Sequence, residues 1–338
     1  MMNSSVAPGH NSEAIPPDSR VDVFRLSFIL FDIISGTTAS VANFLLLFTI
    51  FKDPHRNLRR SPSTQLVINM AVADFLTGFC CAYQLMVYDS LRLSGMSEES
   101  TDNFLLVTLA IIAISLVVAC CNVVAMACDR WLAVSSALYY RSVVSAKRVK
   151  ALIVTIWIYA VVFTSFLFCP GIPRRIFELL YCNLHVSVPL LVLPALYLRT
   201  FRLLEQQARL RTACLGCSVE QTELRRAQSE KKTTKAFVTI LLLFFVVFLP
   251  YTVTINLRNL CSAGEGKIEL VRSLQIAFRF VFVNACVDPF VYAWRIPKYA
   301  QAVTTILIRY RILRGGRRRG RSNSTDPEST AASREDAL

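Results

Sequence analysis

The chain has 338 residues, of which 54% are hydrophobic, and its mean hydropathy is +0.46. This apolar content is too high for a soluble protein of such length and argues against an enzyme built as a soluble domain. The formal net charge is +14. Because the basic runs flank apolar stretches, we attribute them to membrane orientation and to contact with anionic membrane lipids, and we expect no nucleic-acid partner.

Residues 1–23 are polar and are expected to form an extracellular N-terminal tail. They lack the apolar core and small-residue cleavage site of a signal peptide, so the first membrane helix is expected to act as the signal anchor. Asn3 opens the triplet Asn-Ser-Ser, which is an acceptor for N-glycosylation. Asn3 is therefore a candidate glycosylation site, although such triplets also arise by chance.

Seven apolar stretches follow, each near the length of about 20 residues that crosses a bilayer as a helix. We place them at 24–51, 63–88, 103–134, 149–169, 178–204, 233–257 and 269–294. Basic residues concentrate in the connections after the first, third and fifth stretches and in the tail, which puts the N-terminus outside and the C-terminus inside. The sequence therefore predicts an all-α membrane protein with a seven-transmembrane helix bundle at 24–294.

The segment after the bundle has a different pattern. Residues 295–313 combine apolar residues at helical spacing with basic flanks, which predicts a short amphipathic eighth helix on the inner membrane face. Residues 314–338 are rich in Arg, Ser and Thr and are expected to form a disordered cytoplasmic tail. The Ser and Thr residues near acids are candidate phosphorylation sites.

Ionisable residues inside the apolar stretches are costly and indicate a partner or a function. Asp129-Arg130-Trp131 ends the third stretch. Asp74 lies deep in the second and has two interpretations, a buried acid held by amides such as Asn43, or a cation site or proton-linked switch; both can hold. Asp32 lies level with Arg279 of the seventh stretch, either as a buried ion pair or as part of an anchor for an anionic ligand.

Prolines interrupt two of the predicted spans. Pro189 and Pro194 lie in the fifth stretch and Pro250 lies in the sixth. A proline inside a membrane helix frees a carbonyl group and produces a bulge or kink, so the inner end of the sixth helix can swing about Pro250.

The eleven cysteines do not form a disulfide framework, because most fall within apolar stretches where a thiol packs as a small hydrophobe. Cys214 and Cys217 have Cys-x-x-Cys spacing without a second pair, which gives weak support to a zinc site.

Several motifs, in order and on successive stretches, resemble those of a rhodopsin-like (class A) G protein-coupled receptor over about 24–313. They are Asn43, Ala-Val-Ala-Asp74, Asp129-Arg130-Trp131, Trp157, Pro189 with Tyr197, Phe248-Leu-Pro250 and Asp288-Pro289-x-x-Tyr292. The short second outer loop and Leu105, at the position of the family's usual cysteine, resemble the melanocortin, cannabinoid, lysophospholipid and adenosine receptor branch. The usual disulfide of that loop is therefore expected to be absent.

The resemblance implies how such a receptor is activated. Arg130 is held by Asp129 and by Glu230 at rest, and its release lets the sixth helix move outward and open a cleft for a heterotrimeric G protein. Tyr197 and Tyr292 then stabilise the open state. The same resemblance places Pro250 at the kink and Phe248 at the toggle position, and it implies arrestin and a receptor kinase as partners of the Ser/Thr tail.

The resemblance also implies an allosteric sodium ion and no other cofactor. Its ligands would be Asp74, Asn284 and Asp288, although Ala119 replaces a hydroxyl residue that commonly helps.

The resemblance places an extracellular ligand, lipid-like or peptide, in an apolar outer pocket with few polar points. Its residues would be Asp32, Gln84, Ile112, His185, Ile255, Phe278 and Arg279. Ile112 replaces the acid of amine receptors, so an aminergic ligand is not expected. His185 is either a ligand contact or a histidine satisfied between helices.

Three other functions compete with that of a receptor of the plasma membrane. A transporter or channel commonly carries an internal repeat, and the two halves of this sequence show none. An opsin needs a lysine in the seventh span, and residues 269–294 contain none. An enzyme needs a nucleophile and base in a soluble domain, and we find no such set.

Overall fold

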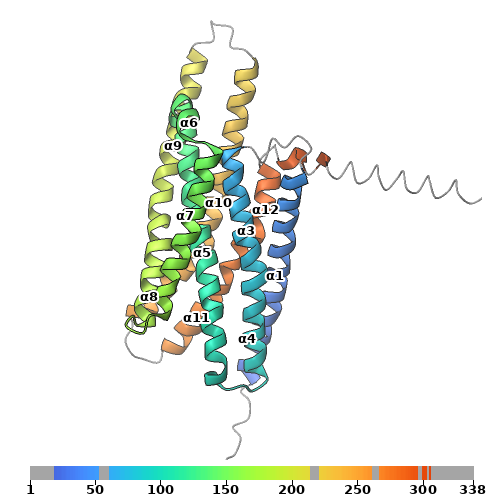
Figure 1. Ribbon diagram of the computed structural model, residues 1–338, viewed down its shortest axis with the longest axis vertical. Coiled ribbons are helices and arrows are strands. Elements are labelled where there is room, and N and C mark those ends of the chain that lie inside the picture. Colours follow the sequence, from blue (N-terminus) through green and yellow to red (C-terminus); the bar gives the residue numbers. More distant parts are fainter. Residues whose placement is uncertain are drawn as a thin grey trace, which may run out of the picture.

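A computed structural model describes residues 19–52, 61–213, 221–260, 266–295, 299–302 and 304–305, and these residues contain helices and no strand. The helices stand side by side along one common direction, and α9 and α10 extend beyond the rest at one end (Figure 1). Within the described residues, seven helical stretches are long and apolar enough to cross a membrane: Val23–Lys52, Pro62–Leu93, Thr101–Ser135, Ala146–Phe168, Arg174–Gln207, Leu241–Leu260 and Glu269–Trp294. The predicted seven-helix bundle is confirmed.

The helices are assigned to the spans as follows. The first three spans are α1 (Ser19–Lys52), then α3 (Pro62–Leu76) with η1 (Thr77–Ala82) and α4 (Tyr83–Leu93), then α5 (Glu98–Ser135). The short α6 (Ala137–Val143) leads to the fourth span, α7 (Ala146–Ser165) with η2 (Phe166–Phe168). The fifth span joins α8 (Arg174–Cys182), η3 (Asn183–Ser187) and α9 (Val188–Ala213). The sixth span is α10 (Gln221–Leu260), and the seventh joins α11 (Gly266–Phe280) and α12 (Phe282–Arg295).

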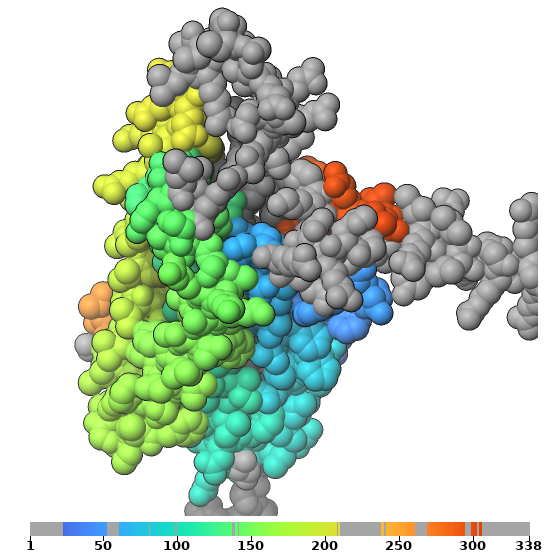
Figure 2. All heavy atoms as spheres, turned by 45° about the horizontal axis from the view of Figure 1, so that its top comes forward, coloured from blue at the N-terminus to red at the C-terminus, as the bar shows by residue number. Residues whose placement is uncertain are grey.

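The third span is the centre of the bundle. Helix α5 contacts α3, α7, α9 and α10, whereas α1 contacts α12 and the second span. On the face shown in Figure 2, the green to yellow surface of α7–α9 adjoins the blue to cyan surface of the second span. The buried apolar side chains of α5 therefore meet those of four neighbouring spans.

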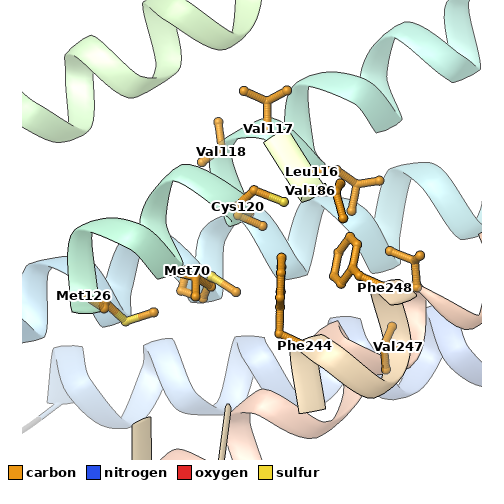
Figure 3. Packing of buried hydrophobic residues seen from close by; sticks show 14 of the residues in the cluster. Met70, Leu116, Val117, Val118, Cys120, Met126, Val186, Phe244, Val247 and Phe248 are labelled. Atoms are coloured by element: carbon orange, nitrogen blue, oxygen red, sulfur yellow. The ribbon is translucent and has the colours of Figure 1, made fainter. Parts of the chain in front are cut away.

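Two phenylalanines of α10 fill the middle of this core. The Phe244 and Phe248 rings stack with their centroids 4.3 Å apart, and both side chains are buried. Figure 3 shows both rings directed toward side chains of other spans, among them Met70 and Cys120. Phe248, the residue at the predicted toggle position, is thus packed in the core.

The outer surface of α7 is apolar. Leu152, Val154, Ile158, Val161 and Val162 are exposed large hydrophobic side chains on one helix. An apolar surface of this extent requires a lipid environment.

The sixth helix begins earlier than its apolar stretch. The candidate span covers Leu241–Leu260, but α10 starts at Gln221. Residues 221–240 contain neither glycine nor proline, so no residue interrupts the helix where its sequence becomes polar. The expected start at 233 lies within this helix.

The bulge expected in the fifth span is present. The π-helical turn η3 (Asn183–Ser187) ends two residues before Pro189. Because proline has no N–H to donate, the preceding turn cannot close in the normal α pattern and widens instead. Pro250 lies inside α10, as expected from the sequence.

A second π-helical turn, η1, was not predicted. It surrounds Gly78, where a Cβ atom, if one were present, would lie 2.7 Å from Ala39 Cβ and 2.9 Å from the Ser40 nitrogen. Gly36 faces it, with a Cβ that would lie 2.9 Å from the Gly78 carbonyl oxygen. The first two spans thus pack backbone against backbone, as small residues permit in membranes.

Some predicted segments lie outside the described residues. The tail at 1–18, with Asn3, and the tail at 314–338 are among them, as is most of 295–313. Residues 299–302 are helical, and Tyr299 and Ala302 are buried. The amphipathic eighth helix stays a prediction.

Replacing Gly78 by alanine should lower the thermal unfolding midpoint of the purified protein, because the new methyl group would meet the α1 backbone. Overpacking of this kind costs about 1–3 kcal/mol. Gly171→Ala is the matched control, because a Cβ at Gly171 meets nothing within 4 Å. Equal midpoints for the two variants would contradict the close packing.

Candidate functional site

The C-terminal end of α5 carries the buried charged pair that the sequence singled out. Arg130 Nε donates to Asp129 Oδ2 at 3.0 Å, and Arg130 Nη2 lies 2.5 Å from the same oxygen. Both residues are 8% exposed. A hydrogen-bonded ion pair of adjacent residues is thus held inside the bundle.

Two further residues complete this cluster. Ser63, at the start of the second span, donates to Asp129 Oδ2 at 2.9 Å and accepts from Arg130. Tyr140 of α6 donates to Asp129 Oδ1 at 2.8 Å. Burial and then the Asp129 carboxylate raise the pKa of Tyr140 to about 12, so its hydroxyl keeps the proton that it donates. Asp129 therefore joins three helices.

Ser63 and Tyr140 were not predicted to be members of the cluster. Ser63 precedes an apolar run, where a hydroxyl is common, and Tyr140 lies in a short connection between two spans. The one available signal was the position of the Tyr139-Tyr140 pair shortly after Asp129.

The structure describes the side chains of some of the other predicted activation residues. Tyr197 and Tyr292 are buried in α9 and α12, and the Tyr292 hydroxyl lies 3.7 Å from Met126 Sδ on α5. Glu230 lies in α10, but its side chain is outside the described residues, so the Arg130–Glu230 contact stays a prediction.

A small cavity of about 10 Å³ lies next to Asp74 in the middle of the bundle. Asn284, Ala119 and the rings of Phe244 and Phe248 also line it. Asn284 Nδ2 donates to Asp288 Oδ2 at 3.1 Å, which connects Asp288 to the cavity wall. The three predicted sodium ligands are therefore neighbours, with two of them at the cavity.

The oxygens of this group are incompletely satisfied. Within the described part of the chain, Asp74 Oδ2, Asn284 Oδ1 and Asp288 Oδ1 are buried without a hydrogen-bond partner. Hard cations bind oxygen ligands of this kind. The donor set thus fits a small cation, with Ala119 contributing no oxygen.

Asn43 does not hold Asp74. Its Nδ2 donates to the carbonyl oxygens of Ala39 and Ala285, each at 2.9 Å. The expectation of an Asn43–Asp74 contact is wrong, because backbone carbonyls on two helices take both of its donor hydrogens.

A polar chain links the second, third and fourth spans. Trp157 Nε1 donates to Asn69 Oδ1 at 2.9 Å, and Asn69 Nδ2 donates to Asn122 Oδ1 at 3.0 Å. Asn122 Nδ2 donates in turn to the Leu66 carbonyl at 2.9 Å. Trp157 therefore makes a directed hydrogen bond besides its packing, and Asn122 is a structural residue that sequence reasoning missed.

A larger cavity of about 230 Å³ lies toward the opposite end of α5, the end predicted to face outward. Four of the predicted ligand residues line it, namely Ile112, Ile255, Phe278 and Arg279. Gln84 is not part of its lining. Leu105, at the position of the family's cysteine, lines it, and the cysteines described are free thiols.

Arg279 makes the ion pair predicted for it. Its Nε lies 3.2 Å from Asp32 Oδ2, and both side chains are buried. Asp89 also bonds Arg279 and lies 3.6 Å from Arg25, and the Phe28 ring lies 3.9 Å from the guanidinium carbon. Asp32 therefore lies behind Arg279 as its counter-ion rather than in the cavity wall.

His185 is satisfied between helices. Its Nε2 lies 2.8 Å from the Tyr159 hydroxyl and its Nδ1 lies 3.1 Å from the Tyr181 carbonyl oxygen. It is buried against Phe163 and is absent from the cavity lining. Of its two interpretations, the structure supports packing.

Comparison with known proteins gives a consistent result. The family profile described as 7 transmembrane receptor (rhodopsin family) matches residues 42–171 and 169–292. The chain is 26% identical to human melanopsin over 94% of its own length and 70% of the relative's, and it spans 66% of rat melanopsin. It is 25% identical to rat trace amine-associated receptor 8a over 80% of the chain and 82% of that protein. None of these likenesses selects the melanocortin, cannabinoid, lysophospholipid and adenosine branch.

Tyr140→Phe should lower the free energy of unfolding by about 1 kcal/mol, because Asp129 Oδ1 would lose its donor. Tyr139→Phe is the control, since the Tyr139 side chain is exposed and should change stability little. Thermal unfolding of the purified variants measures both. A Tyr139 variant as unstable as the Tyr140 variant would argue against the hydrogen bond.

Proposed function

Since the chain belongs to the rhodopsin family of seven-transmembrane receptors, we propose that it is a plasma-membrane receptor that binds an extracellular ligand and activates a heterotrimeric G protein. The observation that carries the proposal is the buried Asp129–Arg130 pair at the end of the central span. The pair lies near the C-terminal end of α5, and α6, which follows it, lies at the end where α9 and α10 extend beyond the bundle (Figure 1).

The proposed mechanism starts from a resting state in which Arg130 is neutralised by Asp129 and Glu230. Ligand binding at the outer cavity moves the inner half of α10 outward about Pro250. Phe248 supports this coupling, because the same ring lines the central cavity two residues before the proline. Arg130, with Tyr197 and Tyr292 around it, then faces the G protein.

We also propose a sodium ion as an allosteric modulator. Asp74, Asn284 and Asp288 supply the oxygens, and two buried carboxylates need a cation or a proton to offset their mutual repulsion. The bound ion stabilises the closed arrangement of α10, whose phenylalanines line the same cavity.

The proposal includes the orientation and the remaining partners. The N-terminus is outside, where Asn3 carries a sugar, and the C-terminal tail is inside, where a receptor kinase and arrestin act on its Ser and Thr residues. Light sensing is not carried over from melanopsin, because residues 269–294 contain no lysine.

Arg130→Ala should abolish stimulation of guanine-nucleotide exchange, whereas Glu230→Ala should raise it in the absence of ligand. The first removes the G protein contact, and the second removes one restraint on α10. Nucleotide exchange is measured in membranes at equal surface expression. Glu205→Ala is the control, because Glu205 is an exposed acid in the C-terminal half of α9. Unchanged basal exchange in the Glu230 variant would sink the proposed restraint.

Sodium chloride should raise the thermal unfolding midpoint of the wild type above its value in choline chloride at equal ionic strength. Asp74→Asn should lose most of this difference, because the cation loses a charged ligand. Asp102→Asn should keep it, since Asp102 is exposed near the start of α5. A sodium effect of the same size in both variants would refute the ion site.

A further inference from the structure

The outer cavity is lined by two separate groups of ion-paired residues and by apolar side chains. Leu109, Ile112, Ile255 and Phe278 contribute to the wall. The charged lining residues are Asp89 and Arg279 at one place and Arg174, Glu178 and Arg258 at the other. These two groups differ in how their charges are balanced.

The first group is neutral among its described members. Arg279 and Arg25 face Asp32 and Asp89, which gives two positive and two negative side chains. The Arg279 side chain is 8% exposed and also packs against Phe28. A ligand anion would have to displace a buried carboxylate to bind Arg279, so the first group is a poor binding site for an anion.

Among the side chains that line the cavity, the second group carries a surplus of one positive charge. Glu178 is shared by two guanidinium groups, with Arg174 Nε at 3.3 Å from Oε1 and Arg258 bonded to Oε2. The Arg174 and Arg258 side chains are 51% and 27% exposed. Each guanidinium has five N–H donors, more than one carboxylate can use. One further carboxylate would balance the charge and take up these donors.

We propose that the cavity binds an amphipathic molecule with one carboxylate head group, held by Arg174 and Arg258, and an apolar body along the Ile112–Phe278 wall. This inference rests on the proposed receptor function and names the ligand class of the same site. A single surplus charge matches a monoanion. The volume of about 230 Å³ is below the usual 300–1,000 Å³ of ligand pockets, so it suits a single apolar chain rather than a folded peptide.

The head-group site lies between the outer ends of the fifth and sixth spans. Asn183 Nδ2 donates to Asn256 Oδ1 at 3.1 Å, and Arg175 bonds Asn259, so polar contacts join these two spans beside the Glu178–Arg258 pair. A carboxylate that takes Arg258 from Glu178 changes the contact between α8 and α10. The same α10 carries Pro250.

The test uses the full chain in lipid nanodiscs and measures its thermal unfolding midpoint with four probes. Dodecanoate, dodecanol, dodecylammonium and dodecyl phosphate share one apolar chain and differ in head-group charge. Of these probes, only dodecanoate should raise the unfolding midpoint, and the rise should level off as its concentration increases. An equal rise with dodecanol, or a larger rise with dodecyl phosphate than with dodecanoate, would overturn the carboxylate assignment.

Charge variants separate ligand binding from a structural role of the cluster. Arg258→Gln and the more exposed Arg174→Gln should each weaken dodecanoate binding about tenfold. Glu178→Gln should strengthen it, because the competing carboxylate is gone. Arg272→Gln is the control and should bind as the wild type does, since Arg272 pairs with Glu269 and does not line the cavity. Weaker binding in the Glu178 variant would overturn the proposal.

Nucleotide exchange distinguishes a failed ligand class from a failed receptor function. Arg130-dependent exchange without charge-selective dodecanoate binding would overturn the ligand class and leave the receptor function intact. Charge-selective binding without any Arg130-dependent exchange would support the carboxylate site and refute the receptor function.

Discussion

The rest of this structure depends on the absence of water inside a membrane, where each buried polar group needs a partner within the protein. Asn43 meets this need by bonding carbonyls of two helices, and Asn69 does so through Asn122 and Trp157. Arg279 is held by two carboxylates. These contacts join distant spans, so the polar residues determine which helices are neighbours while apolar packing fills the space between them.

The spans and the Asp32–Arg279 pair could be predicted from the sequence, because both follow from the length and level of apolar stretches. Asp89 could not, since its position near the end of a stretch indicates a loop residue until a facing arginine is known. The roles of Ser63 and His185 depend on residues of other helices, and no spacing along the chain encodes these contacts. Asn43 shows the same limit, because backbone carbonyls compete with carboxylates for an amide.

The two ends of the bundle differ in how closely they follow the family. The end predicted to face inward has Asp129, Arg130 and Tyr292 in the family's order, and the matching residues 42–292 include all three. The end predicted to face outward has Leu105 in place of a cysteine and a three-residue charge cluster around Glu178. A ligand selected by such a cluster cannot be inferred from relatives that are about a quarter identical.

The contact between Gly36 and Gly78 has a mechanical consequence. Where two helix backbones touch, no flexible side chain lies between them that could adjust to a sliding motion. We therefore expect the first and second spans to move as one rigid unit. Asp32 and Asp89 belong to this unit and form ion pairs with Arg279, which attach the outer half of the seventh span to it. The first, second and seventh spans are thus joined near Arg279, and the proposed movement of the sixth span would take place against them.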